Sequence, residues 1–443
     1  MVGFSVQLDD SLKARYLCLQ ILLGVFKGGR SVAQILEKKS VYAPLYRDCD
    51  VAKAKRLSDF IFVHLRQVDD CIEPHISKNI KLEVRNIFRL VVAESADKSL
   101  PDYAIVNSAV KLAKLNKVSR YFTGFINAVS RKIVSNLKNN NLDFKPELEK
   151  TLKVYLRKYY AEEMIKKLEK LIIRSVPVDI TLKDAKDRSF FIKELGAVEL
   201  PTGTLRLKNK KGLAALEGFK TGKWWVQGIS SAMPVKLLGN IYGLEVLDLF
   251  SAPGGKAMQL ISAGAIVSCL DVSSKRLELL KQNLVRMEMK AEIIRADIEK
   301  FRTNKKYDII LIDAPCSASG TIRKNKDLIH LNPMERIYNL KKIQGYALEA
   351  AKSWVKDSGR ILYSTCSLFP EEGEEQIKNF LNKNKDWMQK VICADNFDLD
   401  EDWLDKNGAL RLRPDHLFDL GGIDGFYASL LIKKQLSQEM PEF

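Results

Sequence analysis

Apolar residues recur at helical spacing through the first 137 residues of the chain. The repeats are typical of one buried face per helix. Two further helices are predicted at residues 103–114 and 122–137, since Pro101 and Asp102 supply a start signal. The pattern predicts an all-α bundle over residues 1–140, which ends at the polar break of residues 138–141. The repeating positions are Leu12, Tyr16, Leu19, Leu22 and Phe26, then Leu57, Phe60, Ile61 and Leu65, then Ile80, Val84, Ile87 and Val91.

A shorter segment of mixed character follows the bundle. Residues 146–175 resume a charged helical pattern, and residues 176–182 and 197–207 have the composition of short strands. They predict a small α+β module over residues 145–220. The module carries a basic cluster that fits either a groove for a nucleic-acid backbone or a solvated hairpin: Arg206, Lys208, Lys210, Lys211 and Lys220.

From residue 244 the pattern changes to strand, glycine turn, helix and strand. This order is typical of βαβ units on a parallel sheet. It predicts a Rossmann-like α/β domain over residues 221–443 that closes with an antiparallel strand at residues 425–433. The predicted strands are 244–250, 266–271, 291–296, 308–313 and 360–364, and the predicted helices are 256–262, 273–287, 337–355 and 370–383.

Composition and charge favour a multidomain soluble protein with a polyanionic partner. The 443 residues are 46% apolar and 29% charged, which excludes a disordered or fibrous chain. The net charge is +17, and residues 1–220 hold 41 Lys and Arg against 25 Asp and Glu, whereas residues 221–443 hold 31 against 30. Because cationic side chains release counterions from phosphates, the basic N-terminal half predicts RNA as a partner, although surface solubility is the plainer explanation.

The cysteines and the apolar runs indicate the compartment. Seven scattered cysteines without a CxxC pair predict neither disulfides nor zinc, and the four histidines lack metal-ligand spacing. No run approaches the 18 apolar residues of a membrane span, and the apolar stretch at 16–26 follows two aspartates where a signal peptide would be basic. We expect a cytoplasmic protein with no membrane or metal.

A glycine turn joins the first strand of the α/β domain to its helix. The run from Asp248 to Lys256 reads Asp-Leu-Phe-Ser-Ala-Pro-Gly-Gly-Lys, which matches neither the dinucleotide fingerprint nor the phosphate loop. Glycine lets a ligand approach the backbone, and a helix start offers free N–H groups. Asp271 and Asp297 end the next two strands, at positions where an acid can reach a ribose. Together they predict a ligand that contains a nucleoside.

Two cysteines follow neighbouring strands of the same sheet. Cys316 comes just after Asp313, and Cys366 comes just after the next predicted strand. Carboxyl ends of adjacent parallel strands lie about 4.8 Å apart, so both loops can open into one crevice. A single cysteine is more often an inert core residue. Two beside one ligand site favour a chemical role, and the spacing does not choose between them.

A thiol beside a methyl donor has a specific use in pyrimidine chemistry. Carbon 5 of a pyrimidine is a poor nucleophile until a thiolate adds to carbon 6. The carbon-5 proton must then leave and the thiolate must be expelled. An acid such as Asp313 near ring nitrogen 3 would stabilise the change of charge on the ring.

These motifs resemble the Sun/nucleolar-protein family of RNA cytosine-5 methyltransferases. The matching motifs extend from Trp225-Val226-Gln227 to the terminal run Gly421 to Phe426, and include the glycine turn and both cysteine loops. The helical bundle, with residues 103–110 and 125–129, is similar to the NusB-like RNA-binding domain of the branch that acts on the bacterial small ribosomal subunit. The resemblance implies a Rossmann-like, S-adenosylmethionine-dependent domain that methylates cytosine C5 in 16S ribosomal RNA. We also expect a monomer.

The resemblance also implies a role for each site residue. Cys366 would be the nucleophile, Cys316 would assist product release, and Asp313 would act near the ring. Alternatives are a transfer RNA cytosine-5 methyltransferase and a non-catalytic RNA-binding assembly factor. The S-adenosyl-L-methionine contacts would be Phe250, Ser251, Ala252, Pro253, Gly254, Gly255, Lys256, Asp271, Asp297 and Asp313.

The chain departs from the family pattern at several positions. Family members usually carry Cys-Ala at Phe250-Ser251, Thr at Ala257, Asp at Gly228 and Gly-Thr at Ala318-Ser319. None of the departures removes a proposed catalytic group. The glycine at 228 predicts a looser helix start, because an N-cap carboxylate is lost there.

Overall fold

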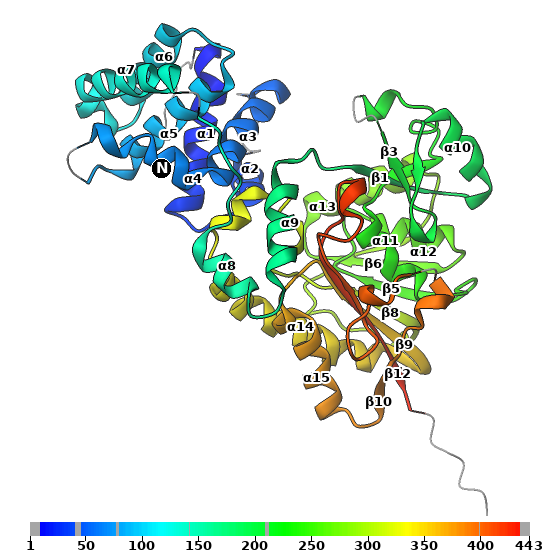
Figure 1. Ribbon diagram of the computed structural model, residues 1–443. Helices are drawn as coiled ribbons and strands as arrows, with labels where there is room; N and C mark the ends of the chain where they lie inside the picture. Colours follow the sequence, from blue (N-terminus) through cyan, green and yellow to red (C-terminus); the bar gives the residue numbers. More distant parts are fainter. Residues whose placement is uncertain are drawn as a thin grey trace, which may run out of the picture. The chain divides into compact units, whose positions relative to one another are not determined.

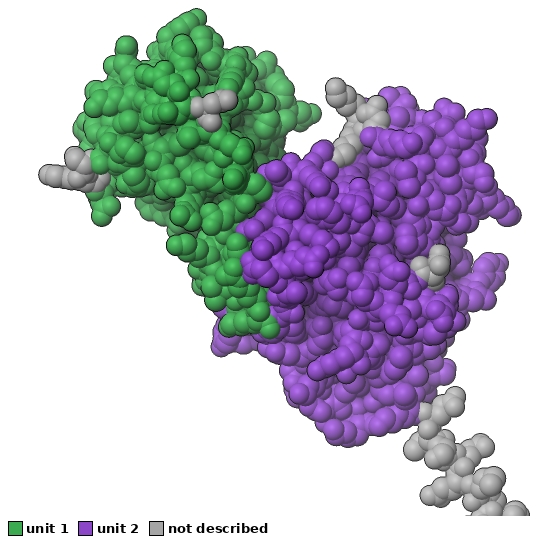
Figure 2. Space-filling view, in the orientation of Figure 1, with its two compact units in different colours: residues 1–158, 324–332 green, residues 159–323, 333–443 purple. Residues whose placement is uncertain are grey.

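The computed structural model describes residues 9–39, 46–76, 79–140, 142–208, 212–397 and 399–434. The chain forms two compact units, which Figure 2 colours separately. Unit 1 comprises residues 1–158 and 324–332, and unit 2 comprises residues 159–323 and 333–443. This grouping differs from the three segments expected at 1–140, 145–220 and 221–443, because the small middle module and the C-terminal domain form one unit.

Unit 1 is a helical bundle, as the apolar spacing predicts (Figure 1). Asp9 caps the first helix by accepting a hydrogen bond from the Ser11 N–H at 3.0 Å, and Pro101 immediately precedes the sixth. The apolar positions named in the sequence are mostly buried, including Leu12, Leu22 and Ile61. The α-helices are α1 (Asp10–Phe26), α2 (Val32–Lys39), α3 (Asp48–Val63), α4 (Leu65–Asp70), α5 (Leu82–Asp97), α6 (Asp102–Leu115), α7 (Thr123–Asn139) and α8 (Lys150–Leu156).

A segment from the C-terminal half of the chain completes unit 1. Residues 324–332 contain the short 3-10 helix η8 (Lys326–His330). Asp327 Oδ2 accepts a hydrogen bond from the Val32 N–H at 2.9 Å, at the start of α2. The His330 Nε2 lies 2.7 Å from the Phe62 carbonyl oxygen. The buried apolar side chains of the segment are Leu328, Ile329 and Leu331.

A four-stranded antiparallel sheet, in the order β2-β3-β1-β4, forms the small module of unit 2. Two of the segments expected to be strands contain β1, β2 and β3. The fourth strand lies beyond residue 220, where the module was expected to end, so that boundary separates β4 from its partner β1. The elements are α9 (Glu162–Ile173), β1 (Val178–Leu182), α10 (Arg188–Glu194), β2 (Val198–Glu199), β3 (Leu205–Leu207) and β4 (Trp224–Val226).

The basic cluster of this module does not form one surface. Arg206 is buried and pairs with Asp179 through two contacts of 2.7 and 3.0 Å. Both interpretations of the cluster are wrong for Arg206, because its guanidinium has protein partners in place of phosphate or solvent. Lys208 and Lys220 are exposed, and Lys210 and Lys211 lie outside the described residues.

The large sheet of unit 2 has the order β10-β12-β9-β8-β5-β6-β7, with β11 paired to β12 (Figure 1). The pairs among β5 to β9 are parallel, and β12 pairs with β9 in the antiparallel sense, so the predicted closing strand is confirmed. The strands are β5 (Glu245–Leu249), β6 (Ile266–Asp271), β7 (Glu292–Arg295), β8 (Tyr307–Asp313), β9 (Val355–Thr365), β10 (Trp387–Lys390), β11 (Leu410–Leu412) and β12 (Phe426–Lys433).

Helices cover both faces of this sheet, because successive side chains of a strand point to opposite faces. Ile309 and Leu311 of β8 belong to one apolar cluster, and Ile310 and Ile312 belong to the other. The first cluster includes side chains of α11, α12 and α13, and the second includes side chains of α14 and α15. These helices are α11 (Ile229–Lys236), α12 (Gly255–Ser262), α13 (Ser274–Arg286), α14 (Pro333–Trp354) and α15 (Glu374–Lys383).

Within the described part of the chain, no helix has the length and apolar character needed to cross a membrane. In those same residues, His, Cys, Asp and Glu side chains do not gather in any group of three that could hold a metal ion.

Candidate functional site

The glycine turn wraps around the carboxyl end of β5 and leads into α12. Phe250 and Gly254 adopt left-handed backbone conformations, with φ of 60° and 102°. A side chain at 254 would be strained by this positive φ. Its Cβ would also lie only 3.1 Å from Leu280 Cδ1. The Ser251 N–H donates to the Leu270 carbonyl oxygen at 3.1 Å, which ties the turn to the end of β6.

Asp271 stands at the end of β6 and contacts the glycine turn. Its Oδ2 accepts a hydrogen bond from the Ala252 N–H at 3.3 Å, and its Oδ1 accepts one from the Ser273 N–H at 2.9 Å. Arg276 Nη1 lies 3.4 Å from Oδ2, and another Arg276 nitrogen donates to the Ala252 carbonyl oxygen. The turn and this carboxylate therefore form one group, and the Arg276 guanidinium contacts both.

Asp297 follows β7 and lies beside the same strand ends. The Ala296 N–H donates to the Asp271 backbone carbonyl oxygen at 3.3 Å, which brings the two chain segments together. The Asp297 Oδ1 accepts a hydrogen bond from the Glu299 N–H at 3.0 Å. Its side chain is only partly buried, so a ligand at the carboxyl edge of the sheet can reach it.

Asp313 ends β8 and forms an ion pair with the lysine of the glycine turn. The Lys256 Nζ lies 2.7 Å from Asp313 Oδ2, and the Ser364 Oγ donates to Asp313 Oδ1 at 3.2 Å. Lys256 is buried and its Nζ lies 5.0 Å from the centre of the Phe426 ring. The ion pair links the turn after β5 to the two cysteine-bearing loops.

Asp248 is an acid of this region that the sequence interpretation did not assign to the site. It is fully buried in β5, and neither of its carboxylate oxygens has a hydrogen-bond partner among the described residues. Burial, and then the nearby negative charge of Asp313, raise its pKa to about 7. The signal in the sequence is an aspartate between two leucines in the middle of an apolar strand.

The two thiols meet at the ends of β8 and β9. The Cys316 Sγ and Cys366 Sγ are 3.4 Å apart, and both residues are partly buried. The loops are joined by two backbone hydrogen bonds, from the Ala314 N–H to the Ser364 carbonyl oxygen and from the Gly320 N–H to the Cys366 carbonyl oxygen, both 2.9 Å long. The proximity of the two loops that the strand order predicts therefore brings both thiols together.

The surroundings of the Cys316 thiol raise its pKa. The hydrogen bond with Cys366, burial, and the negative charges of Cys366 and Glu372 raise the pKa of Cys316 well above its usual value. Cys316 therefore keeps its proton at neutral pH.

The terminal glycine motif supports the Cys316 loop. The Gly425 N–H donates to the Gly320 carbonyl oxygen at 2.9 Å. A Cβ on Gly320 would lie 2.0 Å from the Gly425 carbonyl oxygen, so only glycine fits at this close approach. The motif before β12 thus packs directly against the loop that carries one thiol.

The glycine at 228 is compensated from another element. The Asp179 Oδ2 accepts a hydrogen bond from the Ile229 N–H at 3.2 Å, at the start of α11. A carboxylate from β1 thus takes the place of an N-cap side chain. The expectation of a looser helix start is wrong, because the missing group is supplied by Asp179.

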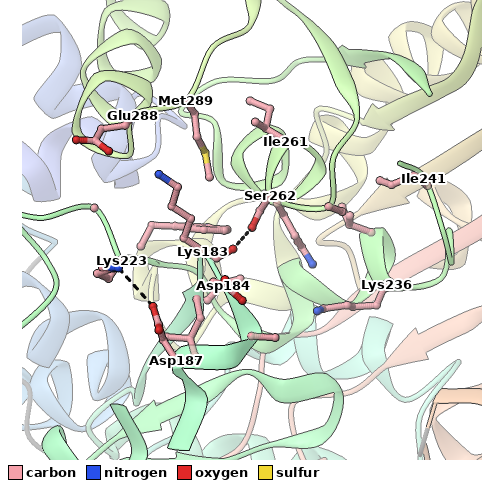
Figure 3. Close-up of a pocket in the computed structure, with 18 of the residues that line it drawn as sticks. Lys183, Asp184, Asp187, Lys223, Lys236, Ile241, Ile261, Ser262, Glu288 and Met289 are labelled. Carbon is pink, nitrogen blue, oxygen red and sulfur yellow. Dashed lines mark hydrogen bonds and ion pairs between the residues drawn. The ribbon is translucent and has the colours of Figure 1, made fainter. Parts of the chain in front are cut away.

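A cavity of about 1020 Å³ lies elsewhere in unit 2 (Figure 3). Its lining residues Ile241, Ala263 and Met289 precede β5, β6 and β7, so it opens at the amino ends of these strands. Two contacts join residues of its lining. Lys223 Nζ lies 3.6 Å from Asp187 Oδ2, and the Ser262 hydroxyl donates to the Lys183 carbonyl oxygen. None of the predicted site residues lines it, because they follow the opposite ends of the strands.

Comparison with protein families finds matches for two separate parts of the chain. Residues 238–432 match the family described as 16S rRNA methyltransferase RsmB/F, and residues 12–135 match the NusB family. The Ribosomal RNA small subunit methyltransferase B of Photorhabdus laumondii subsp. laumondii is 34% identical over 235 residues, which are 52% of each chain. The chain thus aligns with about half the length of the curated relatives it matches. The predicted family resemblance is confirmed.

Solved structures support the same fold. The crystal structure of PH0851 has a TM-score of 0.68 and 21% identity, and the similarity covers 94% of this chain and 99% of that one. NSun6 from Pyrococcus horikoshii, solved with SFG, has a TM-score of 0.54 and 19% identity over 64% of this chain and 98% of its own. With the family matches, these similarities confirm the expected helical region followed by a domain with the fold of S-adenosylmethionine-dependent methyltransferases.

Proposed function

We propose that this chain, in which an RsmB/F methyltransferase region follows a NusB-like region, methylates carbon 5 of a cytosine in 16S ribosomal RNA. The observation that carries the proposal is the pair of thiols, Cys316 and Cys366, which lie 3.4 Å apart in the loops that follow β8 and β9. Other methyl transfers do not require two thiols, whereas carbon-5 chemistry needs one sulfur to add to the ring and benefits from a second. The proposed substrate implies work in the cytoplasm, and we expect a monomer.

The residues at the carboxyl edge of the sheet suit S-adenosyl-L-methionine. The turn from Phe250 to Lys256 offers backbone N–H groups at the start of α12, and Asp271, Asp297 and Asp313 offer carboxylates from three strand ends. The carboxylates can accept hydrogen bonds from the ribose hydroxyls and the amino group of the cofactor, and the N–H groups can donate to its carboxylate. When bound, the cofactor supplies an electrophilic methyl group.

The chemistry starts when Cys366, having lost its proton to solvent, adds as a thiolate to carbon 6 of the cytosine. The electrons of the 5,6 double bond then shift within the ring and make carbon 5 a nucleophile. Asp313 stabilises the change of charge at ring nitrogen 3. After methylation, carbon 5 loses its proton to a water molecule, the electrons of that bond re-form the 5,6 double bond, and the bond between carbon 6 and the Cys366 sulfur breaks. The protonated Cys316 is suited to return a proton to that sulfur, which supports its role in product release.

A trapping experiment with the two cysteine variants tests the assignment. RNA that carries 5-fluorocytosine holds the covalent adduct, since its carbon 5 has no proton to lose. We expect Cys366→Ala to abolish both methyl transfer and trapping. We expect Cys316→Ala to retain bond formation and to accumulate a protein–RNA adduct even on ordinary cytosine.

Two controls make this experiment decisive. Both variants should bind S-adenosylmethionine normally, because neither thiol is proposed to hold it, and Cys393→Ala, an exposed cysteine, should behave as the unmodified protein. If Cys316→Ala prevents trapping and Cys366→Ala does not, the nucleophile is Cys316.

The RNA substrate is tested separately. Mapping 5-methylcytosine in total RNA from cells with and without the protein should show a lost mark in 16S ribosomal RNA. A mark lost from transfer RNA would support the first alternative. If no mark is lost but the purified protein binds 16S ribosomal RNA, a non-catalytic assembly factor would be supported.

A further inference from the structure

Glu372 is a buried carboxylate between the two cysteine loops. It lies in the 3-10 helix η9 (Pro370–Glu372), and its relative exposure is 0%. A carboxylate at such a depth is destabilising unless donors surround it. Its surroundings therefore indicate what holds it there.

Four donors fill the acceptor sites of Glu372. Its Oε1 accepts hydrogen bonds from the Ser317 N–H at 2.9 Å and from Gln344 Nε2 at 3.1 Å. Its Oε2 accepts hydrogen bonds from the hydroxyls of Ser317 at 2.5 Å and Ser367 at 2.6 Å. Hydrogen bonds to an ionised group are shorter and about twice as strong as neutral ones. The carboxylate thus binds three separate segments at once.

The position of these donors relates Glu372 to the thiols. Ser317 directly follows Cys316, and Ser367 directly follows Cys366. Gln344 of α14 also donates to the Pro315 carbonyl oxygen at 2.9 Å, on the other side of Cys316. Each cysteine is therefore one peptide bond away from a residue that Glu372 or its partner holds.

A second set of contacts closes the same network. The Ser319 hydroxyl lies 3.2 Å from the Ser367 hydroxyl and accepts a hydrogen bond from the Leu368 N–H at 2.9 Å. The Tyr363 hydroxyl donates to the Glu372 backbone carbonyl oxygen at 2.7 Å, which anchors η9 to β9. The network therefore resists both separation and rotation of the two loops.

We propose that Glu372 is a positioning residue that holds the Cys316 and Cys366 loops so that their sulfurs stay within contact distance for addition and release. The inference rests on the proposed function for its purpose, but the geometry it describes can be tested without methyl transfer. Glu372 touches neither thiol through a hydrogen bond, so it acts through Ser317 and Ser367.

Glu372 also acts on Cys316 through its charge. The titratable groups that act on Cys316 are Cys366 from the loop after β9, Glu372 from η9 and Tyr363 from β9. The negative charge of Glu372 contributes to the raised pKa of Cys316. Removing the charge should therefore lower that pKa.

The first test measures the distance between the thiols in the full-length protein. Dibromobimane bridges two thiols that lie close together, and peptide mass spectrometry identifies a bridge between Cys316 and Cys366. We expect Glu372→Gln to slow this bridge by about tenfold relative to single alkylation of Cys316 at the same pH, so that a change in thiol reactivity cancels; tenfold is the size of effect of one lost hydrogen bond to a charged group. Glu371→Gln is the matched control, because Glu371 lies in the same 3-10 helix and accepts a hydrogen bond from Tyr159 at 2.9 Å, away from the cysteine loops.

The second test is a readout that a purely structural role would leave unchanged. Site-resolved alkylation by iodoacetamide across a pH series should show Cys316 reacting at lower pH in Glu372→Gln than in Glu371→Gln. Methyl transfer by Glu372→Gln should have a reduced kcat with unchanged S-adenosylmethionine affinity. If Glu372→Gln does not fold, Ser367→Ala, which removes one donor, is tested in the same way.

The outcomes separate this inference from the proposed function. If folded Glu372→Gln keeps the rate of bridging and the Cys316 titration of the unmodified protein, the positioning role is wrong. If both change as expected and the unmodified protein methylates no RNA, the positioning role stands and the proposed function fails.

Discussion

Asp248 shows how one residue can make the stability of the candidate site depend on pH. Its pKa is raised to about 7, first by burial and then by Asp313. The unfolded chain ionises Asp248 at a much lower pH than the folded protein. The stabilisation that it contributes is therefore complete below about pH 4 and is lost as the pH rises towards 7.

Replacing Asp248 with asparagine should remove this pH dependence. Asp248→Asn should have a larger free energy of unfolding than the unmodified protein, and this gain should be greater at pH 8 than at pH 5. The difference between the two gains should be on the order of 2–3 kcal/mol, since each unit of pKa difference is worth about 1.4 kcal/mol. Urea unfolding followed by tryptophan fluorescence measures it, because all five tryptophans lie in unit 2 with Asp248.

An exposed aspartate provides the comparison. Asp386→Asn should change the free energy of unfolding by the same amount at pH 5 and at pH 8. An effect of Asp248→Asn that is equal at pH 5 and pH 8 would mean that Asp248 is ionised in the folded protein throughout this range.

Residues next to a strand end were predictable, and residues held by distant partners were not. Asp313, Cys316 and Cys366 follow apolar strands directly, so local sequence and strand adjacency were enough to bring them together. Glu372 gave no comparable signal, because its partners lie up to 55 residues away. Arg206 was misread for the same reason, since its partner Asp179 lies on another strand.

At the scale of elements, the long βαβ pattern was predictable and the short elements were not. Strands β5 to β8 and the helices between them lie within one or two residues of the predicted ranges, because glycine turns and apolar residues mark their ends. Strand β9 (Val355–Thr365) begins five residues before the predicted 360–364. Strand β4 has three residues, too few for a periodic signal, and its pairing with β1 depends on tertiary contacts. Helix η8 was missed because residues 324–332 belong to a different unit from their neighbours in the sequence.

The cap that η8 gives to α2 leads to an element-scale prediction. Asp327→Ala removes the acceptor of the Val32 N–H, and loss of such a cap costs about 1 kcal/mol. Hydrogen exchange measured by mass spectrometry should become faster in residues 32–39 by about fivefold, the equivalent of that free energy. Exchange in β5 should not change.

The conservative variant separates the cap from simple packing. Asp327→Asn keeps an acceptor oxygen and should restore most of the protection of α2. Equal exchange in Asp327→Ala and the unmodified protein would show that α2 does not depend on this hydrogen bond.

The charge of the whole molecule is divided unequally along the chain. Residues 1–220 carry 41 Lys and Arg against 25 Asp and Glu, and the remaining residues are almost balanced. Removing the first half to test RNA binding would also remove the partners of the buried Leu328, Ile329 and Leu331. Substitution in the full-length protein is the cleaner test.

Three exposed lysines of the basic half can be compared with three of the balanced half. Replacing Lys114, Lys132 and Lys166 with glutamine should weaken binding to 16S ribosomal RNA and reduce its salt slope by about 2, since each lost phosphate contact removes 0.7–0.9. The same replacement at Lys281, Lys300 and Lys385 should have a smaller effect. Equal slopes for the two triple variants would mean that RNA binding does not depend on the basic half.

Because residues 324–332 belong to unit 1, the ribosome completes this unit only late in synthesis. The ribosome completes the first part of unit 1 at residue 158, and about 165 residues pass before Lys324 emerges. At 5–20 residues per second, this interval is roughly 10–30 seconds. Throughout it, the nascent bundle waits without the cap of α2 and without the apolar side chains that finish its core. A chaperone that shields apolar surface would therefore find a binding site on the N-terminal bundle until Asn332 has emerged from the ribosome.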